Sequence, residues 1–337
     1  MLSIACVLLA VGYVAWVVLR HQVIIRNASV SSVPIAPSGP DAIAALEKRP
    51  HLMFRSTALG DTFGGIALVP LAAPGGPRTM ATLQCDRVYF AAGIGICLAG
   101  YQGQLAAYSG YLFDANFQLR YTFPLNGLPS RARISPDGRY AALTVFVTGH
   151  SYNEAGFSTQ TTILDTASGA MLGDLEQFTV WRNGARFQAA DFNFWGVTFA
   201  HDSDHFYATL KSGDRTYLLE GNVSSHQAHI LYENVECPSL SPDNTRVAFK
   251  KAIVRDGRSM WQLSILDLAS LHETPLTAET RSVDDQVEWL DNNHVLYALV
   301  DDGPSPTVGE NVWVLPTDGT GPPRVFLPKA YSPTVIR

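Results

Sequence analysis

The sequence predicts an all-β fold, a six-bladed β-propeller behind an N-terminal transmembrane helix. The first observation is a turn of the Ser-Pro-Asp-Gly type at 135–138, between an apolar strand and a β-rich strand. Pro presets φ at the second turn position, Asp bonds back to the backbone and Gly accepts positive φ, so the stretch is a hairpin signal. Similar hairpins recur at 199–210, 240–249 and 289–299. Repeats of about 40 to 50 residues of all-β sequence are typical of propeller blades.

The second observation is that five repeats have four expected strands, whereas the first has three. The first repeat has expected strands at 51–57, 65–71 and 78–83, and no inner strand precedes them. The tail Ala330–Ile336 is similar in pattern to the inner strand at 237–241. We expect this tail to complete the first sheet, because an open sheet edge promotes fraying and aggregation. The other repeats are expected at about 87–123, 132–175, 195–231, 239–276 and 286–327.

Composition sets the broad class. A chain of 337 residues can bury a large core, and the repeats favour one closed array over several domains. The net charge is −6, and no basic patch with interleaved aromatic residues is present. These features argue against nucleic acid as a partner.

The N-terminus differs from the rest of the chain. Met1–Leu19 contains no charged residue and is long enough to cross a bilayer. A basic start and a small-residue cleavage site, which mark a cleaved signal peptide, are not clear here. We therefore expect a membrane anchor at 1–20, a stalk at 21–50 with a short helix at 41–48, and the propeller at 51–337. Arg20 and Arg26 favour a cytoplasmic propeller, but long domains translocate despite flanking charge, and we expect an extracytoplasmic one.

The cysteines leave two interpretations open. Cys85, Cys97 and Cys237 are compatible with an oxidising compartment but do not require one. Cys85 and Cys97 are candidates for a disulfide inside one blade. The alternative is that all three are buried thiols, which behave as small apolar side chains.

The Ser-Pro-Asp-Gly hairpins, six repeats and late closure resemble TolB-like β-propellers, whose repeats are called PD40, over about residues 50–337. Four stretches are similar, more particularly, to a family of membrane-anchored TolB-like translocation proteins: 149–152, 193–199, 237–243 and 281–289. The resemblance implies the fold and no specific activity. The motif is altered at 201–203 and 290–292 and replaced by Gly93-Ile-Gly95, which blurs the expected blade edges.

The sequence contains no recognisable catalytic motif. A serine hydrolase would need a Gly-x-Ser-x-Gly elbow in a separate α/β domain, and the sequence has neither the motif nor the spare length. His226 and His229 form the closest histidine pair, in a polar turn region where solvated histidines are commoner than metal ligands. Gly93 and Gly95 have no following helix whose N-terminus would bind an anion. The sequence thus predicts no catalytic residue, no cofactor and no metal site.

Propeller topology places the candidate site at the mouth of the central channel. Loops that enter inner strands and loops that join second to third strands meet on one face. The polar residues expected there are Arg131, His150, Tyr152, Asp191, Asn193, Asp284, Asp285 and Gln286. They form either a recognition site on a rigid scaffold or a set of side chains that bond backbone groups of neighbouring blades. Lys250, Lys251, Arg255 and Arg258 are expected at a solvated hairpin tip, and Trp195 and Trp289 below the mouth.

We therefore expect a non-catalytic binding or scaffolding module that recognises a protein or cell-envelope component at the channel mouth. This expectation rests on the fold, which by itself supports many activities. The alternative is a propeller-funnel enzyme acting on a polysaccharide, a lyase or a hydrolase. Such an enzyme would bring three or more histidines to the channel, where the sequence places only His150.

Overall fold

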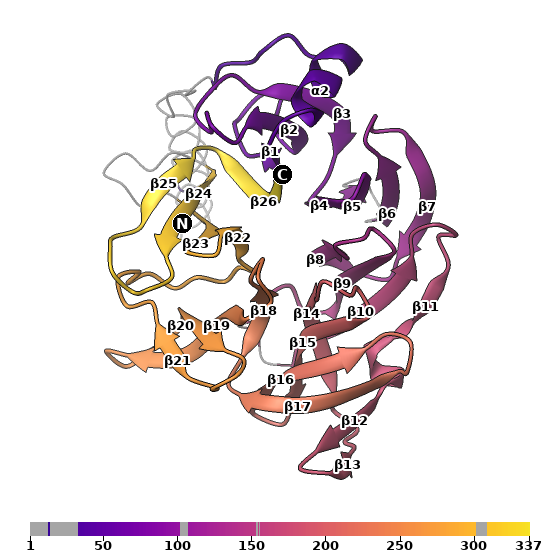
Figure 1. The fold of residues 1–337 in the computed structure, drawn as a ribbon, viewed down its shortest axis with the longest axis vertical. Helices are drawn as coiled ribbons and strands as arrows, with labels where there is room; N and C mark the ends of the chain where they lie inside the picture. Colours follow the sequence, from indigo (N-terminus) through magenta and orange to yellow (C-terminus); the bar gives the residue numbers. More distant parts are fainter. Residues whose placement is uncertain (1–12, 14–32, 102–106, 153, 155, 301–308) are drawn as a thin grey trace, which may run out of the picture.

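The computed structural model describes residues 13, 33–101, 107–152, 154, 156–300 and 309–337. Six sheets stand around a central axis, as Figure 1 shows. Sheets that are neighbours around the ring are consecutive in the chain. The predicted six-bladed β-propeller is confirmed.

Blades 1 to 6 are defined here by their strands, taken from the axis outward. Blade 1 contains β26 (Ala330–Ile336), β1 (His51–Ser56), β2 (Gly65–Pro70) and β3 (Thr79–Gln84). Blade 2 contains β4 (Arg87–Ala91), β5 (Ile94–Tyr101), β6 (Ala107–Asp114) and β7 (Leu119–Leu125). Blade 3 contains β8 (Leu128–Ile134), β9 (Tyr140–Thr148), β10 (Ser158–Asp165) and β11 (Met171–Asp174), followed by the short 3₁₀ helix η1 (Leu175–Gln177).

Blade 4 contains β14 (Asn193–Phe199), β15 (His205–Ser212), β16 (Arg215–Asn222) and β17 (Gln227–Glu233), and two further strands described below. Blade 5 contains β18 (Glu236–Leu240), β19 (Arg246–Arg255), β20 (Arg258–Asp267) and β21 (Glu273–Pro275). Blade 6 contains β22 (Glu288–Asp291), β23 (His294–Val300), β24 (Glu310–Pro316) and β25 (Arg324–Leu327).

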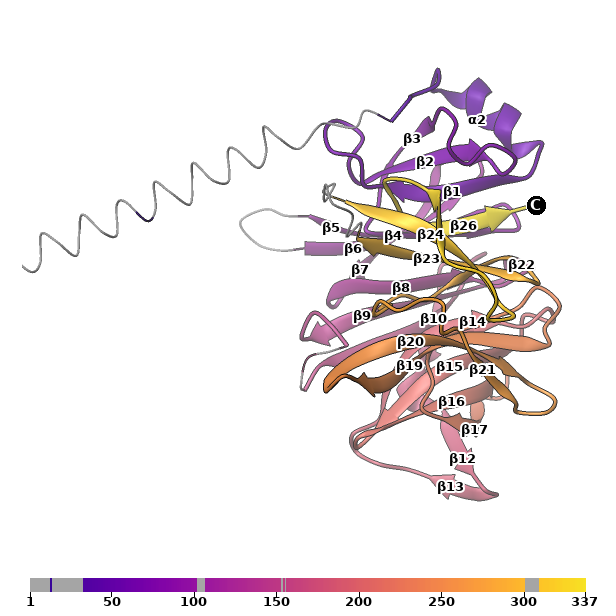
Figure 2. The same ribbon diagram turned by 90° about the vertical axis from the view of Figure 1, so that its left-hand side faces the viewer.

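The two faces of the ring carry different connections. Loops between second and third strands share one face, here called the mouth face, and the Ser-Pro-Asp turns share the other, the turn face. Figure 2 shows the ring edge on, with the C-terminus at the turn face and the long β19–β20 hairpin crossing the full width of the ring. Positions at the tips of the second and third strands therefore belong to the mouth face.

Turn chemistry accounts for the hairpins at the turn face. In blade 3, Ser135 Oγ donates to Asp137 Oδ1 (2.7 Å) and accepts from the Tyr140 N–H (2.9 Å). Ser241 and Asp243 repeat this arrangement in blade 5 (2.6 Å). Where the motif is altered, the aspartate still caps the turn, since Asp202 accepts from the His205 N–H in blade 4 (2.9 Å). The altered motifs thus keep their local function.

The C-terminal strand closes the ring. β26 pairs antiparallel with β1, from Ser56 opposite Ala330 to His51 opposite Ile336, at the inner position that the sequence predicts. β26 also contacts blade 2, because Ser332 Oγ accepts from the Val88 N–H (3.3 Å) and donates to the Val88 carbonyl (3.0 Å). The last strand of the chain thus joins the first two blades.

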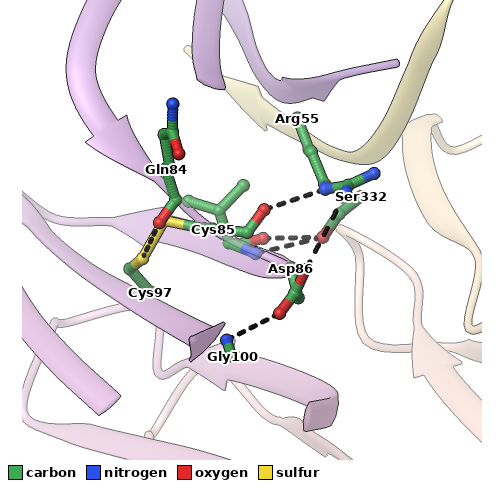
Figure 3. The surroundings of a disulfide bond; sticks show 8 residues. Arg55, Gln84, Cys85, Asp86, Cys97, Gly100 and Ser332 are labelled. Carbon is green, nitrogen blue, oxygen red and sulfur yellow. Dashed lines mark hydrogen bonds and ion pairs between the residues drawn. A yellow bond between two sulfur atoms is a disulfide. The ribbon is translucent and has the colours of Figure 1, made fainter. Parts of the chain in front are cut away.

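A disulfide lies at the same junction. Cys85, in the connection from blade 1 to blade 2, is bonded to Cys97 of β5, so one of the two open interpretations of these cysteines holds. Figure 3 shows its surroundings: Arg55 Nε donates to the Cys85 carbonyl (2.9 Å), and Asp86 Oδ2 accepts from the Gly100 N–H (2.8 Å). Cys237 is a buried free thiol.

Blade 4 has a six-stranded sheet, which the sequence did not predict. The connection from blade 3 forms a hairpin of β12 (Thr179–Arg182) and β13 (Ala185–Phe187), and β12 lies parallel to β17 at the outer edge. Figure 1 shows this hairpin projecting from the ring. Strands of four and three residues without a Ser-Pro-Asp turn have too weak a local pattern to be recognised.

Part of the predicted stalk lies on the propeller. Helix α2 (Pro40–Glu47) begins with Pro at its first position, as expected from its fixed φ. Its Ile43 and Leu46 are buried in a core shared with blades 1 and 2, and Ile35 bridges to Arg78. In the described part of the chain, no helix is long and apolar enough to cross a membrane. The predicted anchor at 1–19 lies outside the described residues, apart from Tyr13.

Candidate binding site at the channel mouth

A completely buried lysine stands at the centre of the candidate site. Lys250 lies on β19, and its ammonium packs over the rings of Trp261 (3.9 Å to the centroid) and Tyr152 (4.3 Å). Its Nζ donates to Asp284 Oδ1 (2.5 Å) and lies 3.7 Å from Glu236 Oε2. Buried charges are costly unless paired, so these partners are what keep the lysine in place. The prediction that Lys250 belongs to a solvated hairpin tip is wrong.

Arg131, on β8 of blade 3, is the second cation of the site. Its guanidinium lies 3.6 Å from Asp284 Oδ1, over the Tyr152 ring (5.1 Å), and donates to the Ser130 carbonyl (2.9 Å). The Tyr152 hydroxyl in turn bonds Ser130 Oγ (2.6 Å). We call this group the Lys250 cluster; it spans blades 3, 5 and 6 and consists of Arg131, Tyr152, Glu236, Lys250, Trp261 and Asp284.

A second layer of ion pairs lines the axis. Arg87 lies 3.6 Å from Asp285 and packs over the Tyr331 ring (4.3 Å). Arg133 lies 3.7 Å from Glu288 and packs over the Tyr89 ring (4.6 Å). The cavity left among Arg87, Arg131 and Asp285 measures about 10 Å³, about the smallest volume that holds one water molecule. The axis is therefore nearly filled at Arg87, Arg131 and Asp285, whereas a cavity of about 220 Å³ adjoins Arg133 and Glu288.

The pKa values of the carboxyl groups are shifted in opposite directions in the two layers. Burial acts to raise the pKa of the Asp284 carboxyl, but the charges of Lys250 and Arg131 outweigh it and hold this pKa below its usual value. Burial raises the pKa of Glu288, although Arg133 opposes the change. Asp284 is thus ionised at neutral pH, at the only carboxylate position of the Lys250 cluster that is substantially exposed (34% of its side chain, against 9% for Glu236).

Four other predicted site residues bond the backbone of the blades. Asn193 Oδ1 accepts from the Thr159 N–H (2.9 Å) and links blades 3 and 4. Gln286 Nε2 donates to the Val197 (3.1 Å) and Pro238 (2.7 Å) carbonyls. Asp285 Oδ2 accepts from the Ala298 N–H (3.0 Å), and exposed Asp191 accepts from the Gly213 N–H (2.6 Å). The contacts of Asn193 and Gln286 cross between blades, as the second interpretation of the mouth residues expects, whereas Asp191 and Asp285 accept from backbone of their own blades.

The remaining predicted residues lie apart from the cluster. The His150 side chain is 80% exposed and lies 3.9 Å from Glu154. Lys251 pairs with Glu273 (2.7 Å) on the outer side of blade 5. Trp289 donates from Nε1 to the Ser239 carbonyl (2.9 Å). Of the eight predicted mouth residues, Arg131, Tyr152 and Asp284 come together, and Glu236 and Trp261 join them without any signal in the sequence that sets them apart.

The mouth face also presents apolar side chains to solvent. Five of the twelve exposed large hydrophobic residues among those described lie on its loops or strand tips. We call these the apolar rim: Leu59, Phe63, Val147, Val254 and Val300. Val254, at 74% exposed, is the most open of them. By the same criterion the turn face contributes Leu119, Met171, Leu271 and Val325, three of them at the start of outer strands.

The site offers fixed charge and apolar contact. In the described ranges, no group of three or more His, Cys, Asp or Glu residues is placed to hold a metal ion. The carboxylates of the Lys250 cluster are engaged with cations and with the Trp261 N–H (3.2 Å to Glu236). Ordered charges of this kind position and discriminate a bound partner.

Fold and site together define a six-bladed β-propeller with a charged mouth. No protein-family model matches the chain, and no curated protein matches it in sequence. Several solved structures are similar to it in fold. TolB from Acinetobacter baumannii has a TM-score of 0.56 at 13% identity, covering 85% of this chain and 66% of that chain. A chain of the nidogen/laminin complex has a TM-score of 0.54 at 13% identity, covering 85% of this chain and 98% of its own length. At such identities the likeness shows the fold alone.

Proposed function

We propose that this chain is a membrane-anchored, non-catalytic binding or scaffolding module whose propeller holds a protein or cell-envelope component at its mouth face. The observation that carries the proposal is the pairing, on one face, of the ordered Lys250 cluster with the apolar rim. Binding surfaces combine apolar contact, which supplies affinity, with fixed charges, which supply register and discrimination.

The position of the apolar rim around the Lys250 cluster supports the choice of the mouth. Apolar side chains exposed at loop tips lose contact with water when a partner covers them, and this burial favours association. Blades hold these tips on rigid strands, so that little ordering is required on binding. One structural neighbour was solved within a nidogen/laminin complex, which agrees with a protein partner for a propeller of this size.

The proposal also includes the location of the propeller. We take residues 1–20 as the anchor, 21–50 as the connection and 51–337 as a propeller outside the cytoplasm. The Cys85–Cys97 disulfide supports this placement, because disulfides persist in oxidising compartments. The alternative, an enzyme acting on a polysaccharide, has no specific observation in its favour.

Site-specific photo-cross-linking of the full chain in its membranes tests the proposal. A benzophenone amino acid at Val254, on the mouth face, should give a discrete adduct. The same group at Leu271, on the turn face, is the matched control and should give none. Absence of an adduct at Val254, or identical adducts from both positions, would show that the mouth face does not bind a partner.

A further inference from the structure

The β19–β20 hairpin of blade 5 extends past the strand on its inner side. β18 pairs with β19 only as far as Lys250, whereas β19 and β20 stay paired without a break as far as Arg255 opposite Arg258. A two-residue turn at 256–257, with positive φ at both residues, closes the hairpin as a type I′ turn does. Residues 251–255 therefore form an open sheet edge at the mouth face, on the side of β19 that faces the axis (Figure 2).

Backbone groups on this edge point away from β20. In an antiparallel pair, residues that bond their partner alternate with residues that direct their N–H and C=O outward. A two-residue turn makes Arg255 and Arg258 a bonded pair, so Ala252 and Val254 are directed outward. The Ala252 carbonyl agrees with this, because it accepts from Asn234 Nδ2 (3.2 Å). Among the described residues, the Ala252 N–H and both backbone groups of Val254 have no hydrogen-bond partner.

This edge lacks two features that usually protect an open strand. Natural proteins often blunt such edges with proline or with a bulge. Residues 251–255 contain no proline, their pairing with β20 has no register shift, and Val254 is 74% exposed. A cavity of about 360 Å³, with the β15–β16 hairpin in its wall, adjoins Ala252. A strand laid along the edge would therefore have room for a side chain on that side.

The tip of the hairpin carries two cations that face each other. Arg255 and Arg258 lie directly opposite, and like charges in such positions destabilise a hairpin. In the described part of the chain, neither guanidinium has an ion pair or a ring contact. Asp256 is the only carboxylate in residues 252–259, so two cations face one anion. An anionic group from a partner would relieve this repulsion.

We infer that the open edge of β19 receives an extended segment of the partner protein, which adds as a strand and places an acidic side chain beside Arg255 and Arg258. A peptide backbone supplies the donors and acceptors that Ala252 and Val254 require. A lipid surface would meet the same charges without using these backbone groups. A second copy that paired through the same edge would bring two cationic tips together. The inference rests on the proposed function and adds how the partner is held.

Fluorescence anisotropy with the full chain tests the inference. The probe is the fluorescein-labelled peptide Thr-Val-Glu-Val-Glu-Thr with blocked ends. Val254→Pro removes an outward N–H that does not bond β20, a position where an edge strand tolerates proline. It should weaken binding fivefold or more, about the loss expected for one backbone hydrogen bond. Ser259→Pro, directly opposite on the other edge, is the matched control and should bind as the parent protein does.

A second arm reverses the charges with Arg255→Glu and Arg258→Glu. This double variant should bind the peptide about tenfold more weakly, and it should prefer a lysine version of the peptide, which the parent protein should not. Arg324→Glu, at an exposed arginine of β25, is the control. Circular dichroism monitors folding, and the charge arm still decides the question if a proline variant does not fold.

Equal peptide binding by Val254→Pro and the parent protein, or unchanged binding after the charge reversal, would overturn the inference. A parent dimer that Val254→Pro separates, or binding to phosphatidylglycerol vesicles and not to the peptide, would also overturn it. The two proposals fail separately. If the peptide binds and no adduct forms at Val254 in membranes, the edge stands and the proposed function fails. If the adduct forms and the peptide does not bind, the mouth face holds its partner by other contacts and the inference fails.

Discussion

Replacement of Lys250 by methionine removes the one completely buried cation of the site and keeps the length of the side chain. Asp284 would keep Arg131, 3.6 Å away, and Glu236 would keep the Trp261 N–H (3.2 Å) as neighbours that stabilise their charges. Breaking a buried pair by removing one partner costs about 3–5 kcal/mol. Because a third of the Asp284 side chain is exposed, we expect the lower end, about 3 kcal/mol. This corresponds to a melting temperature lowered by roughly 6–10 °C.

The sign of the pH dependence follows from Asp284. Its pKa is depressed in the folded protein, so the pair contributes stability above the unfolded carboxyl pKa, and that contribution is lost as pH falls through the folded pKa. The difference between the parent protein and Lys250→Met should therefore narrow below about pH 4. Circular dichroism of thermal and denaturant unfolding, at a series of pH values, measures both quantities.

The matched control is Lys251→Met, one residue along the same strand. Lys251 is partly exposed and pairs with the partly buried Glu273, and breaking such a pair costs less than breaking one whose cation is completely buried. We expect a melt within about 3 °C of the parent protein. Equal losses in the two variants, or a Lys250→Met difference that does not change with pH, would refute the view that the cluster is held by buried charge pairing.

Three further predictions follow from the architecture. Deletion of 329–337 removes the strand that pairs with β1 and should lower the melting temperature sharply; an unchanged melt would contradict closure by β26. Replacing Cys85 and Cys97 by serine removes the cross-link between residues 12 positions apart and should lower the free energy of unfolding by about 3 kcal/mol. Thermal unfolding of this variant is compared with that of the parent protein with and without dithiothreitol. A melting temperature of the parent protein that does not change with the reductant would argue against the disulfide. Asp284→Ala should reduce the yield of the Val254 adduct, whereas Asp285→Ala, which also loses a bond to the Ala298 backbone, should mainly lower the melt; an undiminished yield in Asp284→Ala would remove that carboxylate from partner binding.

The blades could be predicted because their signals are local. Ser135, Asp137 and Gly138 bond one another within four residues, so the turn they form does not depend on distant parts of the chain. Closure was predictable by a simple comparison, since the first repeat lacked one strand and the tail supplied a similar one. Loop positions at the mouth face followed from topology once the blades were known.

The candidate site depended on contacts between blades. From its place before a hairpin tip, Lys250 is indistinguishable from Lys251, yet one is buried and the other partly exposed, because alternate residues of β19 point to opposite sides of the blade. Its partners Tyr152 and Asp284 lie 98 residues before and 34 residues after it. The parallel pairing of β12 with β17 is likewise non-local. Sequence determined the number and order of the blades, through turn and strand chemistry that acts over a few residues. Tertiary structure decided which charges are buried and paired, because burial depends on side chains that only the closed ring brings together.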